Sequence, residues 1–193
     1  NLYTLPLGFV LPYDLADNWQ YQMENPAEVQ NDLCLLLGTD DVLVPVETEV
    51  SGSGCTFTAD MAGEYYVYIQ NKKVKNVKAS LPSGEKNFSN VDRGYLLEMG
   101  NLSEGSRITL TPGESGETLT AAVYRFSPRA MIQVYDRLSQ SPLHLDSWRD
   151  TKLTGTVTAA ESGTLFLSIP YDEGWTITID GQPAEGEKIL EAF

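Results

Sequence analysis

Residues 170–175 carry the densest group of side chains in this sequence that could do chemistry. The loop reads Pro-Tyr-Asp-Glu-Gly-Trp, so it joins two carboxylates, Asp172 and Glu173, to two aromatic rings, Tyr171 and Trp175. Paired carboxylates hydrolyse glycosides when they face each other across a sugar, and aromatic rings offer flat apolar faces. Proline, aspartate and glycine are also the residues of tight turns. We therefore interpret the loop as a tight structural turn that connects two strands, with the Trp175 side chain buried in the core. These four residues remain candidates for ligand binding.

Three further aromatic residues, Trp148, Tyr66 and Tyr68, are candidates for the same role. Residues 64–70 alternate in the manner of a strand, so one face of that strand must be buried. Binding would be favoured if Tyr66 and Tyr68 lay on its exposed face. The predicted ligand-binding residues are thus Tyr171, Asp172, Glu173, Trp175, Trp148, Tyr66 and Tyr68.

The inventory of reactive residues argues against catalysis in this chain. His144 is the single histidine, and no Gly-x-Ser-x-Gly sequence occurs. The sequence has neither a phosphate-binding glycine loop nor histidines and cysteines at metal-ligand spacing. We predict no catalytic residue, no metal ion and no cofactor, and a free-standing glycosidase is the least favoured of the functions considered.

Cys34 and Cys55 are the two cysteines of the chain. They could form one disulfide, but a buried free thiol is the simpler interpretation for Cys34, which lies within an apolar helical pattern. Two cysteines cannot provide the four ligands of a structural zinc site.

The charge of the chain restricts its partners. Lys+Arg 13 against Asp+Glu 27 gives a formal net charge of −14. Such a surface repels nucleic acid, which we exclude as a partner, and it disfavours an anionic membrane surface. A hydrophobic fraction of 41% is sufficient for a packed core.

Two helices are predicted, over residues 26–37 and 128–139. Asn25 and Ser127 are suited as N-caps, and each directly precedes a proline that can occupy the first helical position. Apolar residues then recur at helical spacing, and Gly38 provides a stop for the first helix.

The remaining patterns are typical of short β-strands separated by Gly, Pro and Asn turns. They predict a mainly β fold, an antiparallel β-sandwich of jelly-roll type with the two short helices. We expect residues 1–50 to form an ordered segment with one amphipathic helix that packs on the sandwich. Residues 51–193 would form the sandwich, interrupted by the second helix and ending early at the C-terminus.

Four local predictions complete the outline. Residues 13–24 lack periodicity and are expected to form an ordered loop. Residues 154–160 and 164–169 would pair through a short hairpin loop at 161–163. Asp180-Gly181 predicts another hairpin, because both residues accept positive φ. Residues 188–193 read as a final strand.

The sequence Ser-Ile-Pro-Tyr-Asp-Glu-Gly-Trp at residues 168–175, with Leu153-Thr154-Gly155 before it and Asp180-Gly181 after it, resembles the YfhO-like family of bacterial multi-pass membrane proteins. Residues 5–9 and 25–31 fit the same family in the same order. The resemblance implies an extracytoplasmic β-rich domain that follows a hydrophobic helical bundle. It also implies a GT-C-type glycosyltransferase that uses polyprenyl-phosphate-linked sugars to modify cell-wall polymers such as lipoteichoic acid.

The catalytic acid of such enzymes is expected in a loop of the membrane portion and hence outside this chain. We therefore expect a non-catalytic domain on the extracytoplasmic side of the cell membrane, which positions or recognises glycan or wall polymer. Its second partner would be the transmembrane portion of the same polypeptide. The alternative is a purely structural or protein-interaction module. The chain stops at Phe193, before the usual final strands of the family, so the edge of the sandwich is expected to be incomplete.

Overall fold

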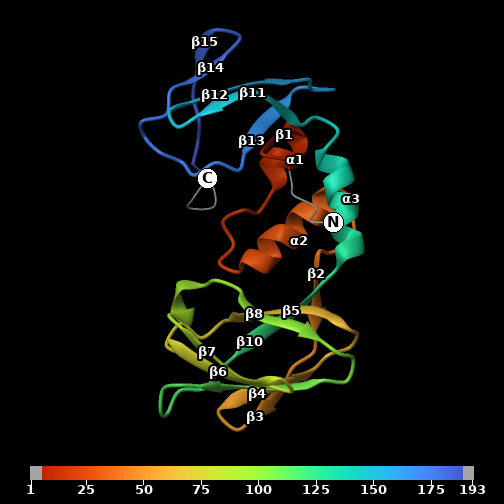
Figure 1. The fold of residues 1–193 in the computed structure, drawn as a ribbon, viewed down its shortest axis with the longest axis vertical. Coiled ribbons are helices and arrows are strands. Elements are labelled where there is room, and N and C mark those ends of the chain that lie inside the picture. The colour runs from red at the N-terminus through yellow and green to blue at the C-terminus, as the bar shows by residue number, and fades with distance from the viewer. Residues whose placement is uncertain (1–5, 189–193) are drawn as a thin grey trace.

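Two antiparallel sheets pack face to face and form the lower part of the molecule in Figure 1. The computed structural model describes residues 6–188. One sheet has the strand order β2-β10-β5-β8, with bounds Leu43–Val46, Ala121–Phe126, Gly63–Ile69 and Leu97–Leu102. The other has the order β3-β4-β9-β6-β7, with bounds Glu49–Ser51, Gly54–Thr58, Arg107–Pro112, Asn76–Leu81 and Gly84–Ser89. The predicted fold class, a mainly β chain built as an antiparallel sandwich, is confirmed.

Alternating residues of the strands fill the space between the two sheets. In β6, Val77, Ala79 and Leu81 are buried while the residues between them are exposed. Phe57 of β4 stacks on Tyr65 of β5 across the sandwich, with ring centroids 5.9 Å apart. The period of two in the sequence thus places one face of each sheet in a common core.

Strand β5 is buried on both of its faces. Tyr65 and Val67 point into the core between the sheets, whereas Tyr68 belongs to a second apolar cluster on the opposite side. That cluster is formed with two helices, α2 and α3, which lie over the sheet (Figure 1). Tyr68 is only 4% exposed and Tyr66 is half-buried, so the exposed tyrosine face that would have favoured binding does not exist.

Helices α2 (Pro26–Leu36) and α3 (Pro128–Leu138) confirm the two predicted helices and their N-caps. The Asn25 side chain accepts a hydrogen bond from the Ala27 N–H at 3.0 Å, and the Ser127 hydroxyl accepts one from the Ala130 N–H at 3.3 Å. Gly38 follows the C-cap residue Leu37 and has φ +66, so the chain leaves the helix in the left-handed conformation that glycine accepts most easily.

Several short elements depart from the sequence-based expectation, among them α1 (Tyr13–Asn18) and β7. Residues 13–24 contain the short helix α1 where an ordered loop was predicted; none of its residues is buried, so no apolar periodicity marks it. Strand β7 was not predicted either, because its residues are mostly polar and it lies at a sheet edge. A short 3₁₀ turn, Val91–Arg93, follows β7.

Three two-stranded ribbons form the upper part of the molecule (Figure 1). They are β1 (Gly8–Pro12) with β13 (Gly163–Leu167), β11 (Leu143–Arg149) with β12 (Lys152–Val157), and β14 (Ile177–Ile179) with β15 (Gln182–Ala184). The predicted hairpin through residues 161–163 is wrong, because β12 pairs with β11 and β13 pairs with β1. Segments about 150 residues apart form the latter ribbon.

The hairpin at Asp180-Gly181 is confirmed. The two residues have φ 51 and 76, and they connect β14 to β15. Of the predicted final strand at 188–193, residues 189–193 lie outside the described residues. The division of the chain near residue 50 stays a prediction. β2 lies before that boundary and β3 crosses it, and each is a strand of one of the two sandwich sheets.

Candidate functional site

The loop at residues 170–175 borders an open hollow of about 480 Å³ on the surface. Thr151 belongs to the turn between β11 and β12, so this hairpin provides one wall and the loop provides the other. The lining residues are Thr151, Ile169, Pro170, Asp172, Gly174 and Trp175. The hollow thus gathers four members of the loop that the sequence singled out for its turn chemistry, together with Ile169 directly before that loop.

Internal hydrogen bonds hold the loop in one shape. Asp172 Oδ1 accepts from the Gly174 N–H at 2.7 Å, and the Asp172 carbonyl accepts from the Trp175 N–H at 3.0 Å. The indole N–H of Trp175 donates to the Pro170 carbonyl at 3.3 Å. A Cβ at Gly174 would meet Asp172 Oδ1 at 2.9 Å, so glycine permits the close turn.

Trp175 is 43% exposed, so the expectation that it anchors the loop in the core is wrong. The reason is the bond of its indole to Pro170, which keeps the ring beside its own loop. A large aromatic surface consequently borders the hollow. Asp172 Oδ2 makes no hydrogen bond to a described residue, so this oxygen remains available as an acceptor.

Tyr171 and Glu173 are exposed but do not line the hollow. Trp148, which is 63% exposed, lies near the end of β11 on the same hairpin as Thr151, and it too is absent from the lining. Asp172 is therefore the one carboxylate among the described residues that border the hollow. Glycoside hydrolysis needs two carboxyl groups on opposite sides of the sugar, and this arrangement provides one.

Tyr66 and Tyr68 lie far from the hollow along the fold and have structural contacts. The Tyr68 hydroxyl donates to the Glu24 carbonyl at 3.1 Å and accepts from Lys72 Nζ at 2.8 Å. The Tyr66 hydroxyl lies 3.4 Å from Glu64 Oε2. Burial, followed by the negative charges of Glu64 and Glu98, raises the pKa of Tyr66. The structure therefore brings Asp172 and Trp175 together and leaves the two tyrosines under the helices.

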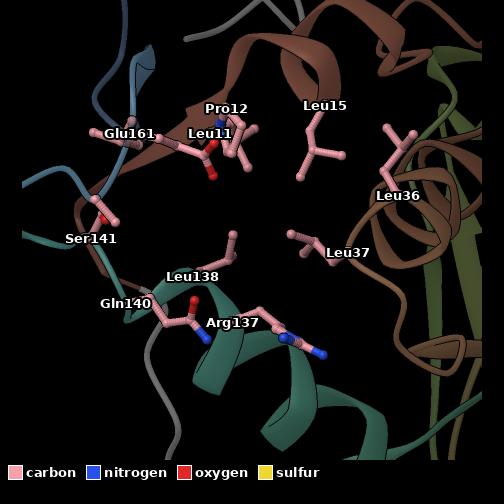
Figure 2. Close-up of a pocket in the computed structure, with 12 residues that line it drawn as sticks. Leu11, Pro12, Leu15, Leu36, Leu37, Arg137, Leu138, Gln140, Ser141 and Glu161 are labelled. Carbon is pink, nitrogen blue, oxygen red and sulfur yellow. The ribbon is translucent and has the colours of Figure 1, made fainter.

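A second cavity, of about 210 Å³, lies between β1, α1, α2 and the end of α3 (Figure 2). Five leucine side chains contribute to its walls, and Arg137, Gln140 and Glu161 lie at its edge. Sequence reasoning missed it, because its walls come from four segments that are separated in the chain. The leucines that line it are Leu11, Leu15, Leu36, Leu37 and Leu138.

Neither cysteine is suited to chemistry. Cys34 and Cys55 are both buried free thiols, so the disulfide alternative is not realised, and the simpler interpretation of Cys34 is confirmed. Burial raises the pKa of the Cys55 thiol to about 11 and also raises that of Cys34. Within residues 6–188, no group of three or more His, Cys, Asp or Glu side chains is placed to hold a metal ion.

Comparison with known proteins gave one match. A family model described as "Bacterial membrane protein YfhO" matches residues 47–193, which include both sandwich sheets in large part, α3 and the loop beside the hollow. Residues 5–9 and 25–31, which carried part of the resemblance, precede the matched region. The comparisons with curated proteins and with solved structures gave no match. In the described part of the chain, none of the helices has the length and apolar character to span a bilayer.

Proposed function

This chain belongs to the YfhO family of bacterial membrane proteins, and on that basis we propose that it is an extracytoplasmic, non-catalytic accessory domain of a membrane glycosyltransferase. The enzyme would transfer sugar from a polyprenyl-phosphate carrier to a cell-wall polymer such as lipoteichoic acid. The chain would position the glycan, with the transmembrane portion of the same polypeptide as its permanent partner.

The observation that carries this proposal is the pairing of Trp175 with Asp172 at an open hollow. The loop hydrogen bonds fix the indole ring before any ligand arrives, so binding does not lose side-chain entropy by ordering it. An aromatic face packs on the C–H face of a sugar ring, and a carboxylate oxygen accepts from a sugar hydroxyl. Both elements of sugar recognition are therefore present on one short loop.

The absence of a second carboxylate at the hollow is the reason to propose recognition and not hydrolysis. An acid and a base would have to face each other across the bound sugar. Asp172 meets no such partner among the described lining residues. Chemistry would accordingly take place in the membrane portion, as the family resemblance implies.

A structural or protein-interaction module is the second candidate. Exposed apolar side chains on the ribbons favour it, since large exposed apolar patches mark interaction surfaces. The two candidates differ in what Trp175 does: glycan recognition needs its exposed ring, whereas an interaction module does not.

Glycan titration tests the proposal. The 193-residue chain would be titrated with lipoteichoic acid fragments and a panel of wall oligosaccharides, followed by tryptophan fluorescence and NMR chemical shifts. We expect saturable shifts in the Trp175 indole and in Thr151. Trp175→Ala should weaken binding about tenfold, because a stacked aromatic ring contributes about 0.5–1.5 kcal/mol beyond its buried area.

Trp148→Phe is the matched control, since Trp148 is equally an exposed tryptophan but does not line the hollow. Its binding should equal that of the unmodified chain. A flat response over the whole panel, or equal losses in the two variants, would remove glycan recognition and leave the interaction module.

A further inference from the structure

The cavity between β1, α1, α2 and the end of α3 combines apolar walls with a charged edge (Figure 2). Its five leucines are joined by Val10, Pro12 and Ala160. Arg137 and Glu161 are the two charged residues of its lining, and both are exposed. A concave apolar space with a few converging polar groups is the usual form of a small-molecule site, so this cavity is a candidate for one.

The polar groups at the edge of the cavity have no partner in the described part of the chain. Neither the guanidinium of Arg137 nor the carboxylate of Glu161 belongs to the ion pairs found among residues 6–188. The side-chain amide of Gln140 makes no hydrogen bond to a described residue. Figure 2 shows Glu161 on one side of the cavity and Arg137 and Gln140 on the other. A cation and an anion thus border the same space without pairing with each other.

The size of the cavity limits what can enter it. An apolar cavity of about 150 Å³ admits benzene, whereas sites for drug-sized ligands begin at about 300 Å³. This cavity, at about 210 Å³, has room for one branched or aromatic hydrocarbon group. Leu15 of α1 and Leu37 at the end of α2 point into it (Figure 2), so the entering group contacts hydrocarbon.

The two charges discriminate between ligands of that size. A fatty acid would satisfy Arg137 but bring its carboxylate near Glu161, and an alkylamine would bring its ammonium near Arg137. Charges interact more strongly beside apolar walls than in water, so each of these ligands meets one repulsive contact. A ligand with both charges next to one apolar group gives each residue a charge-assisted hydrogen bond. An apolar α-amino acid has this arrangement.

We propose that the cavity binds a free α-amino acid with an apolar side chain of the size of leucine. The ligand side chain enters among the leucines of the walls. Its α-carboxylate accepts hydrogen bonds from Arg137 and from the Gln140 amide, and its α-ammonium donates to the carboxylate of Glu161. The proposal is independent of glycan recognition, because the linings of this cavity and of the hollow at residues 170–175 share no residue.

Calorimetric titration of the 193-residue chain with matched ligands tests the proposal. Leucine carries both charges, leucinamide only the positive one, 4-methylpentanoate only the negative one, and 4-methylpentanamide neither. We expect saturable binding of leucine and at least about tenfold weaker binding of the other three, because each lacks a charged hydrogen-bonding partner. Glycine should also bind at least about tenfold more weakly, because it buries no side chain.

Single substitutions assign the contacts. Arg137→Gln and Glu161→Gln should each weaken leucine binding about tenfold. In Glu161→Gln, leucine should lose most of its advantage over 4-methylpentanoate, since the partner of the ammonium is gone. Arg129→Gln is the matched control, because Arg129 is exposed in the first turn of the same helix and does not line the cavity. It should bind leucine as the unmodified chain does.

A larger side chain in the wall tests the location. Leu15→Phe would extend a ring into the cavity and should abolish leucine binding. None of the residues of α1 is buried, so circular dichroism should show an unchanged fold for this variant.

Four results would overturn the proposal. The first is no binding of leucine to the unmodified chain, and the second is binding of leucinamide or 4-methylpentanoate as tight as that of leucine. The third is an equal loss in Arg129→Gln and Arg137→Gln, which would reveal a general charge effect. The fourth is full binding in a folded Leu15→Phe variant. Leucine binding without any response to glycans would support this site and remove only the proposed glycan recognition.

Discussion

The side-chain amide of Asn25 donates a 2.7 Å hydrogen bond to the hydroxyl of Tyr124, a residue 99 positions further along the chain. Both side chains are buried. The same asparagine caps α2 through its oxygen and donates to Glu28 Oε1 at 3.2 Å. One residue thus begins the helix and fastens it to β10, the strand between β2 and β5 in the sheet below.

Asn25→Ala should lower the free energy of unfolding by about 2–3 kcal/mol, since it removes a helix cap and the donor to a buried hydroxyl. Urea denaturation followed by circular dichroism measures this. Ser127→Ala removes only the cap of α3 and should cost about 1 kcal/mol. Equal losses in the two variants would show that the bond to Tyr124 contributes nothing.

Asp60 should make the stability depend on pH. Burial alone raises the pKa of its carboxyl, but hydrogen bonds from Tyr65 and Arg125 outweigh burial and hold that pKa below its ordinary value. A folded-state pKa below the unfolded value of about 3.9 stabilises the fold at higher pH. This contribution is lost as the pH falls from the unfolded pKa through the folded pKa.

Asp60→Asn should therefore lower stability at neutral pH and flatten its decline in acid, as measured by urea midpoints across that range. Glu104→Gln, which removes one exposed carboxylate in a turn, is the control and should keep the decline. An unchanged slope in Asp60→Asn would assign the acid sensitivity to other groups.

Both cysteines should be unreactive in the folded chain. Their thiols are buried, and a pKa of about 11 for Cys55 leaves little thiolate at neutral pH. A thiol reagent should label them only as fast as the chain unfolds. Leu35→Cys, at a position 73% exposed on α2, should be labelled at once. Rapid labelling of the unmodified chain would contradict the burial of both thiols.

Gly174→Ala should disturb the hollow without unfolding the chain. The new Cβ would lie 2.9 Å from Asp172 Oδ1, so the carboxylate must shift, which weakens its hydrogen bond from the Gly174 N–H and loosens the turn beside the Trp175 ring. The indole NMR signal of Trp175 should shift, while the free energy of unfolding from urea denaturation stays within about 0.5 kcal/mol of the original because no residue of this segment is buried. Gly105→Ala, at another surface turn, should leave the indole signal in place. An unshifted signal in Gly174→Ala would show that the turn does not hold the ring.

Local chemistry made several elements predictable. Asn25 and Ser127, each before a proline, define the starts of α2 and α3, and the period of two in β6 defines its buried face. Asp180-Gly181 identifies its hairpin because the turn needs two positive φ values. In each case the signal lies within a few residues of the element.

Elements that depend on distant partners were not predictable in this way. The pairing of β1 with β13 joins segments about 150 residues apart, and no local pattern at 161–163 distinguishes it from a hairpin with β12. The burial of Tyr68 depends on helices that come from two other parts of the sequence. For the same reason, residue types identified the loop around Asp172, but only the fold places Thr151 opposite it.

The burial of β5 on both faces has a consequence for cooperativity. A strand shared by two apolar clusters transmits the loss of either cluster to the other, so the helical layer and the sandwich should unfold as a single transition. Removing residues 1–50 to isolate the sandwich would uncover Tyr68 and Tyr124 and create an aggregation-prone sheet surface. The smallest independently folding fragment of this chain therefore includes α2, although that helix lies outside the region that the family match covers.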